Sequence, residues 1–361
     1  MARARQLALE APSSYGVVAG TRPDDWLECG QLAGSFLPAY EYRPAMSAQY
    51  GLALRGGDGS TYRYGLIGSS DNHKARAGPG YKEIHRKAFG DAYGLRRDWW
   101  DAVAAPDEPL PEPQENASPL KALGAGFERG ASFYYTGGLV AVHAAGRDRR
   151  SIWEAFAARR AYATSGERIL LWFDLLNAPG GPRPMGTEVV LDAEPRFEVR
   201  AVGAFEQLPG CPDGVEERLG SERLQRLCFG ECHHPGDARR RIERIEVVRI
   251  RKQRAPDEPV APLVEDPWLV LPCQDEGQGC RVSFEDRQPA DGRETVYYVR
   301  VLQEPTPAVN GDPMRCERDA EGRCLRARSC PAAGPDFDPE DDCLAPVRER
   351  AWSSPIFVSR P

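Results

Sequence analysis

The chain has 361 residues, with 47 Lys and Arg against 54 Asp and Glu, which gives a formal net charge of −7. This acidic balance argues against a general nucleic-acid binder, and no apolar run reaches the ~18 residues that a transmembrane helix needs. At roughly 150 residues per domain the length predicts two or three domains, and 41% hydrophobic residues excludes fibrous and wholly disordered classes.

The first half of the chain alternates predicted strands and helices, which is typical of an α/β fold. Ile152, Trp153, Phe156 and Ala157 repeat along one stripe and mark the clearest helix. In chain order we expect a strand at residues 13–21, a helix near 45–54, a strand at 62–68, a helix at 81–88, a short strand within 137–146 and a helix at 148–160.

The character of the chain changes after Gly166, where apolar strands follow one another without comparably clear helices. This pattern predicts a β-sandwich-like domain over residues 167–361, with long Cys- and Pro-rich loops, after an α/β domain over residues 1–166. The expected strands are 168–176, 196–205, 242–251, 295–302 and 356–359, and residues 220–228 are a candidate short helix.

Nine of the ten cysteines follow residue 210. An even number of cysteines crowded into loop-rich sequence indicates a disulfide framework and therefore an oxidising compartment, although the pairing does not follow from sequence. Local pairs such as Cys273–Cys280 and Cys316–Cys324 are reasonable guesses. Free buried thiols are one alternative.

A structural zinc site is the other alternative for the cysteines. Cys228, Cys232, His233 and His234 place two thiols and two imidazoles within seven residues, and zinc takes such ligands at short spacings. However, no second pair of cysteines follows at zinc-finger spacing.

The N-terminus is basic, but no apolar segment follows it, so it is not a signal peptide. Either the protein is cytosolic, or residue 1 is not the native start of the gene product.

The strongest local signal is the run from Gly68 to His73, which follows the strand predicted at 62–68. Residues i and i+2 of an extended segment point the same way, so Asp71 and His73 can converge on one point. A carboxylate and an imidazole are ligands typical of a hydrolytic Zn, Mn or Fe site. An ordinary polar turn is the alternative.

The residues that follow are strongly basic. Between Lys74 and Arg97 the sequence has seven basic residues and two acidic ones. Lys74, Arg76 and Lys82 are therefore candidate anion-binding residues, since cations beside a metal stabilise a transferring phosphoryl group. A solvated basic loop is the alternative.

Two further histidines are weaker candidates. His85 lies in the helix predicted at 81–88, where it is either a surface residue or faces the site. His143 ends an apolar strand, where it is either a core histidine with its hydrogen bonds satisfied or a group that supports the site.

The run from Tyr64 to His73 resembles the last metal-binding motif of the PHP (polymerase and histidinol phosphatase) superfamily. More narrowly, the chain is similar to mostly exported PHP-like proteins known as domain of unknown function 3604. Three further stretches carry this resemblance: Gly138 to His143, Ile152 to Gly166, and Arg350 to Ile356.

The resemblance implies a distorted β/α barrel that binds two or three divalent metals and hydrolyses phosphate esters of small substrates. Only Asp71 and His73 carry over as metal ligands, because the chain has no H-x-H motif, which is the first motif of the superfamily. We therefore expect the C-terminal part of a longer periplasmic or extracellular protein: a partial barrel with an incomplete metal site, inactive by itself if the missing ligands are essential. A late start codon or a degenerate relative would also explain the missing motif.

A function of a different class is also consistent with the sequence. The Cys-rich β-domain would then recognise a partner or glycan in an exported protein that has no catalytic role.

Overall fold

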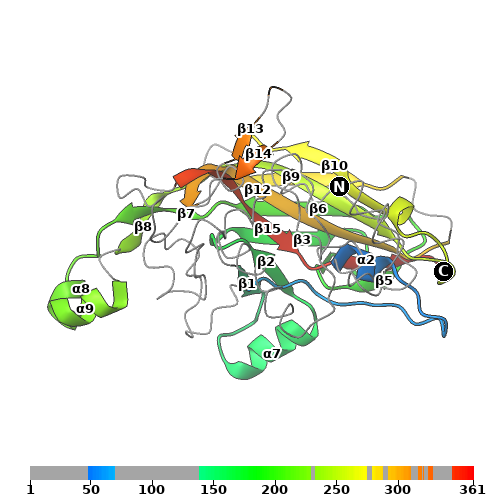
Figure 1. Ribbon diagram of the computed structural model, residues 1–361. Helices are drawn as coiled ribbons and strands as arrows, with labels where there is room; N and C mark the ends of the chain where they lie inside the picture. The colour runs from blue at the N-terminus through cyan, green and yellow to red at the C-terminus, as the bar shows by residue number, and fades with distance from the viewer. Residues whose placement is uncertain are drawn as a thin grey trace, which may run out of the picture.

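The computed structural model of the chain describes residues 48–69, 138–228, 232–274, 279–287, 292–309, 316–318, 320, 324–327 and 344–361. The described part is built mostly from β-sheets with few helices (Figure 1). The strand predicted at 13–21 and the helix predicted at 81–88 lie outside these residues.

The larger sheet has eight strands, in the order β1-β2-β15-β12-β16-β5, with β9 paired to β12 and β10 paired to β9. It therefore combines strands from both halves of the chain, and β1, β2 and β15 lie side by side. The strands are β1 Leu139–Val142, β2 Ala161–Thr164, β5 Glu188–Val190, β9 Ile242–Arg251, β10 Val264–Pro272, β12 Thr295–Val309, β15 Leu344–Ser353 and β16 Ile356–Ser359.

The second sheet has four strands, in the order β11-β6-β3-β4. These are β3 Leu170–Leu175, β4 Arg183–Pro184, β6 Arg196–Val202 and β11 Cys280–Glu285. Burial alternates along β3 and β6, which is the pattern of a sheet with one face on a core. Phe173 and Phe197 from this sheet pack in one cluster with Val247, Tyr297 and Val301 of the larger sheet. The two sheets thus share one hydrophobic core.

A second, smaller cluster covers the opposite face of the larger sheet. Tyr50 and Leu52 of helix α2 (Ala48–Ala53) pack there on Val248, Ile250 and Tyr298. We call this the outer face, because it is turned away from the four-stranded sheet. The predicted helix near 45–54 is confirmed in α2.

Several other predicted elements match the observed ones. The bounds of β9 and β16 equal the predicted ranges, and β1, β3, β6 and β12 begin within two residues of the predicted ones. The helix predicted at 148–160 is α7, Arg149–Ala157, which begins after Asp148 because that side chain accepts a hydrogen bond from the amide of Ser151.

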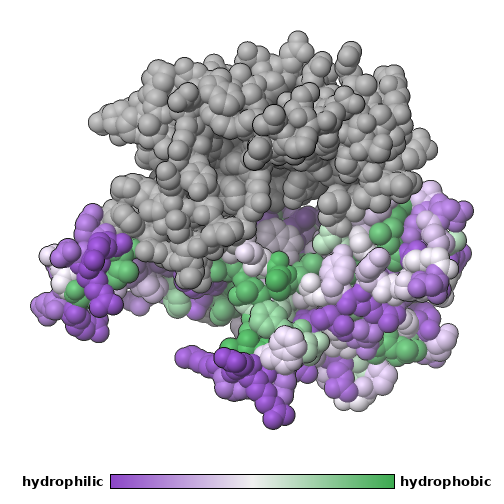
Figure 2. Space-filling model, turned by 60° about the horizontal axis from the view of Figure 1, so that its bottom comes forward, coloured by the Kyte–Doolittle hydropathy of each residue, from purple (hydrophilic) through white to green (hydrophobic). Residues whose placement is uncertain are grey.

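The apolar stripe predicted on α7 is not buried against the described residues. Ala155 is the buried residue of the helix, whereas Trp153 is 70% exposed. Helix α7 lies at the bottom of Figure 1, and Figure 2 turns this side towards the viewer. On it, apolar surface lies between polar areas.

The barrel part of the predicted fold is not shown. The described strands form two sheets and two short ribbons, and none of these closes into a barrel. β1 and β2 pair antiparallel, whereas a β/α barrel needs parallel strands joined by helices. The predicted division after residue 166 stays a prediction, although β1 and β2, which precede it, share a sheet with β15, which follows it.

A helical lobe stands away from the sheets at the end of a two-stranded ribbon (Figure 1). The ribbon consists of β7 (Phe205–Pro209) and β8 (His233–Arg239), and the lobe contains α8 (Val215–Leu219) and α9 (Ser221–Cys228), the helix predicted at 220–228. The remaining elements are the short helix η5, Ala261–Leu263, and a second ribbon formed by β13, Cys316–Arg318, and β14, Cys324–Ala327.

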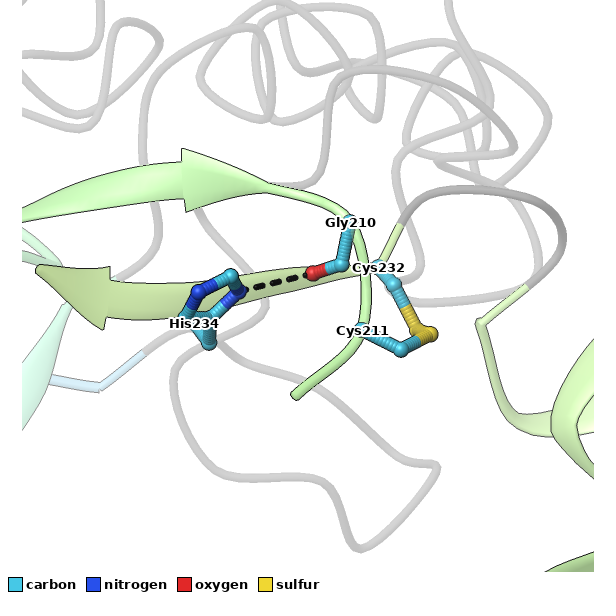
Figure 3. Close-up of a disulfide and its surroundings, with 4 residues drawn as sticks. All are labelled: Gly210, Cys211, Cys232 and His234. Atoms are coloured by element: carbon cyan, nitrogen blue, oxygen red, sulfur yellow. Dashed lines mark hydrogen bonds between the residues drawn. A yellow bond between two sulfur atoms is a disulfide. The ribbon is translucent and has the colours of Figure 1, made fainter. Parts of the chain in front are cut away.

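Two disulfides confirm the predicted disulfide framework. Cys211–Cys232 closes the base of the lobe, and Cys273–Cys280 is the local pair expected from the sequence. Figure 3 shows that His234 bonds through Nδ1 with the carbonyl oxygen of Gly210 at 2.9 Å beside the first disulfide. The zinc alternative is wrong for Cys232, because its sulfur is bonded to Cys211 and is not a free thiolate. The Cys316–Cys324 pair stays a prediction.

Within the described residues, every helix falls short of the length and apolar character that a bilayer crossing requires.

Candidate functional site

The segment at residues 62–69 leads directly towards the motif that the sequence singled out. The sequence predicts a strand at 62–68, but in the structure these residues have no regular secondary structure. Side chains from elsewhere bind their backbone instead. Lys252 Nζ donates to the carbonyl of Tyr62 at 2.5 Å, and the amide of Leu66 donates to Ser354 Oγ at 2.9 Å. The apolar pattern reflects packing, because Tyr64 and Leu66 contact the outer-face cluster.

Two glycines let this segment lie close against the larger sheet. A Cβ on Gly68 would approach the carbonyl oxygens of Leu139 and Thr164 to 2.8 and 3.0 Å, and one on Gly138 would lie 2.7 Å from the amide nitrogen of Ser69. Real Cβ atoms essentially never come closer than 3.0 Å to such atoms. Gly68 also lies over the Cβ of Ala163. The segment therefore crosses β2 and reaches the beginning of β1 at Ser69.

The register shows which face of the sheet the segment covers. Ala163 pairs with Val140 on one side and with Trp352 on the other. Paired residues project from the same face, and Trp352 packs on the outer-face cluster. The segment thus runs over the outer face, towards the end of β2.

The predicted metal ligands Asp71 and His73, the anion-binding candidates Lys74, Arg76 and Lys82, and His85 all lie outside the described residues. The structure describes the chain up to Ser69, two residues before Asp71.

Four arginines lie on strands β9, β12 and β15 of the larger sheet, and three of them are paired with carboxylates. Arg300 donates to Glu246 at 2.6 Å and to Asp266 at 2.8 Å. The other pairs are Arg244 with Glu243 at 2.7 Å and Glu246 at 2.8 Å, and Arg348 with Glu243 at 2.6 Å.

Arg350 is the exception. Its Nε is buried and has no hydrogen-bond partner, and no ion pair of its guanidinium is found among the described residues. Burial, together with the positive charges of Arg300 and Arg244, lowers the pKa of Arg350 to about 10, although Glu246 and Glu349 oppose this shift. A guanidinium left without a partner in such surroundings is costly unless an anion binds it.

Arg350 lies next to the path of the 62–69 segment. It is two residues before Trp352 on β15, so it projects from the same outer face. Its carbonyl accepts a hydrogen bond from the amide of Ser165 at 2.9 Å, directly after Thr164, whose own carbonyl faces Gly68. In the sequence, Arg350 stands out only as the first residue of a stretch that carries the family resemblance. Its lack of a partner has no local sequence signal.

Two carboxylates lie at the same end of β2. Ser165 Oγ donates to the buried Glu349 and accepts a hydrogen bond from the amide of Arg350 at 2.8 Å. Burial raises the pKa of Glu167 to about 7, and the negative charge of Glu349 contributes to this increase. Ionisable groups with shifted pKa values gather at functional sites more often than elsewhere.

The raised pKa of Glu167 predicts a pH dependence of stability. Folded Glu167 holds its proton more tightly than unfolded Glu167, so the free energy of unfolding should fall as pH rises from about 4.5 to about 7. The fall attributable to this group should be on the order of 1–3 kcal/mol after allowance for its partial exposure. Urea unfolding at several pH values should show this slope flattened in Glu167→Gln. Glu154→Gln, on the exposed surface of α7, should keep the wild-type slope, and equal slopes in all three proteins would contradict the prediction.

His143 lies beyond the other end of β1, away from Gly138 and Ser69. Its Nε2 bonds with the carbonyl oxygen of Leu171 at 2.8 Å, and its ring lies 5.4 Å from Tyr162 and 5.8 Å from Trp172. The structure therefore does not bring His143 next to Ser69 or Arg350, and its supporting role in the site stays a prediction.

No group of three or more His, Cys, Asp or Glu side chains that could hold a metal occurs among the described residues. The described part of the candidate site instead consists of a tightly packed entry segment, an arginine without a partner and a pair of carboxylates.

Comparison with known proteins agrees in part with the sequence resemblance. Residues 37–174 match the model of a family described as Protein of unknown function (DUF3604). The matched range includes the 62–69 segment, Asp71, His73, β1, α7 and β2. No curated protein and no solved structure matches the chain. The first half of the chain is thus similar to an uncharacterised domain family.

Proposed function

We propose that this chain belongs to a metal-dependent hydrolase that acts on small phosphate esters, with Asp71 and His73 as metal ligands. The observation that supports this best is the path of the 62–69 segment. Three independent contacts, at Tyr62, Leu66 and Gly68, hold it on the outer face. It crosses β2, the neighbour of the strand that carries Arg350, and ends at the beginning of β1.

Chain geometry links this segment to the proposed ligands. Two residues separate Ser69 from Asp71, so their Cα atoms are at most about 7.6 Å apart, at about 3.8 Å for each step. A segment packed this closely would give the ligands a defined position, which metal sites require. The basic residues Lys74, Arg76 and Lys82 would then bind the phosphate.

The ligand set in this proposal is incomplete. The described residues add no cluster of His, Cys, Asp or Glu that could complete it. A divalent Zn, Mn or Fe ion would stabilise negative charge on phosphoryl oxygens when bound.

Elemental analysis of the purified chain tests this proposal. We expect stoichiometric zinc, manganese or iron in the wild type and its loss in the Asp71→Ala/His73→Ala double variant. His234→Ala/Asp237→Ala is the matched control, because it removes the same residue types from β8, and it should keep the metal. A wild type without metal, or a double variant that keeps it, would overturn the assignment. If the wild type carries metal and the double variant does not, the wild-type protein should be assayed on phosphate monoesters.

An exported binding protein without catalytic activity is the second candidate. The disulfide-closed lobe that projects from the sheets (Figure 1) favours it, because such a lobe offers a surface held apart from the core. The two disulfides are compatible with a periplasmic or extracellular location, which we propose for either function. Metal-free wild-type protein with a native fold would favour this candidate.

A further inference from the structure

We propose that the guanidinium of Arg350 binds a phosphate-type oxyanion on the outer face of the larger sheet. This inference deepens the proposed function, since it names a residue for the substrate phosphate on a strand far in sequence from the basic loop.

The unpaired state of Arg350 is the first argument. Arg244, Arg300 and Arg348 each have a carboxylate oxygen within 2.8 Å. No described carboxylate pairs with Arg350, although Glu349 is its neighbour in sequence. Glu349 instead accepts the hydrogen bond of Ser165 Oγ. Among the described residues, no carboxylate therefore competes with an external anion for the Arg350 guanidinium.

The surroundings of Arg350 provide the second argument. Leu302 of β12 lies opposite Arg350 of β15 on one side and opposite Arg244 of β9 on the other, and it is only 2% exposed. A dry apolar residue between two arginines lowers the local dielectric, which strengthens their attraction for an anion. Arg300 and Arg244 repel the guanidinium, whereas Glu246 and Glu349 attract it, and an oxyanion would relieve the repulsion. The planar guanidinium matches phosphate with two parallel hydrogen bonds.

The position of Arg350 is the third argument. The backbone of Ser165 connects it to the end of β2, where Gly68 brings in the chain that continues to Asp71 and Lys74. An anion held by Arg350 would thus lie on the face of the sheet that the 62–69 segment crosses.

Titration of the full chain with inorganic phosphate, followed by calorimetry in metal-free buffer, tests this inference. We expect saturable binding by the wild type, weakened about tenfold or more in Arg350→Gln, as for loss of a charge-assisted hydrogen bond. Arg348→Gln is the matched control on the same strand, since Arg348 is 44% exposed and already has Glu243 as its partner. It should change the affinity less than about twofold.

Thermal unfolding distinguishes ligand binding from a structural role. A lone charge that awaits an anion is a cost to the free protein, so Arg350→Gln should melt at or above the wild-type temperature without phosphate. Phosphate should then raise the melting temperature of the wild type but not of the variant. Unchanged phosphate affinity in Arg350→Gln, or no phosphate binding by the wild type, would overturn the inference. Arg350→Lys, which keeps the charge but not the bidentate geometry, should bind with intermediate affinity and serves as a second folded variant.

Two further binding measurements identify the ligand and separate this inference from the proposed function. Acetate should bind more weakly than phosphate, and tighter binding of acetate would overturn the assignment to phosphate. The Asp71→Ala/His73→Ala double variant should still bind phosphate in metal-free buffer, so the metal assignment can fail while the anion site stands. Loss of phosphate binding in that variant, with Arg350 intact, would overturn Arg350 as the anchor.

Discussion

Replacing Arg300 by Ala should lower the free energy of unfolding by about 3–5 kcal/mol, as measured for other buried ion pairs that lose one partner. Arg300 is 9% exposed and bonds to two carboxylates that are themselves buried: the side chains of Glu246 and Asp266 are 9% and 5% exposed. Without the guanidinium, Glu246 would keep only Arg244 and Asp266 only Gln49 as donors among the described residues, in a nearly dry environment. The desolvation of these two carboxylates accounts for most of the expected loss.

The same network holds helix α2 on the sheet, which adds to the expected effect. Gln49 of α2 donates to Asp266 at 2.5 Å and to the hydroxyl of Tyr298 at 2.6 Å. Since Arg300 orients Asp266, its loss should also weaken the attachment of α2.

Urea unfolding monitored by circular dichroism measures this effect. Arg150→Ala is the control, because Arg150 pairs with Glu154 on the surface of α7 with its side chain 88% exposed. It should cost no more than about 0.5 kcal/mol. A loss below about 1 kcal/mol in Arg300→Ala would show that water or rearranged side chains compensate the buried carboxylates.

If Asp71 and His73 hold a metal as proposed, replacing Gly68 by Ala should remove it while leaving the sheets folded. The added Cβ would meet the backbone oxygens of Leu139 and Thr164, and backbone in two paired strands cannot move aside as a flexible side chain can. The 62–69 segment must therefore shift, and Asp71 and His73 would shift with it. Changes that misplace metal ligands without removing them typically cost about 10–100-fold in affinity.

Metal content and amide hydrogen exchange together test this prediction. Gly57→Ala is the matched control, because nothing lies within 4 Å of a Cβ at that position, and it should keep both metal and exchange pattern. In Gly68→Ala we expect faster exchange in the 62–69 segment and unchanged protection of β9 and β12. Suppose that the Asp71→Ala/His73→Ala variant loses metal but Gly68→Ala keeps its full metal content. The packing of this segment would then not position the ligands.

Patterns confined to a few neighbouring residues predicted much of the architecture. Short apolar stretches located β9 and β16, because both strands are buried on both faces and such strands carry apolar residues without strict alternation. The apolar stripe located α7 to within one residue of its start, where Asp148 caps the helix through a hydrogen bond made within three residues. The pair Cys273–Cys280 was a reasonable guess because only seven residues separate the two cysteines. For the candidate site, the spacing of Asp71 and His73 together with the family resemblance predicts two metal ligands, and this stays a prediction because both lie outside the described residues.

The long-range contacts were decided by tertiary structure. The apolar run at 62–68 reads as a strand, but its backbone amides and carbonyls bond to side chains such as Ser354 and Lys252, which lie 190 or more residues away. Arg350 looks like any other arginine of an Arg-rich chain until the register of β12 and β15 places it beside Leu302 and Arg300, while Glu349 bonds to Ser165. Local sequence determines which faces are apolar and where elements begin. Which charge finds a partner depends on strand register and packing across the whole chain, and no short pattern encodes these.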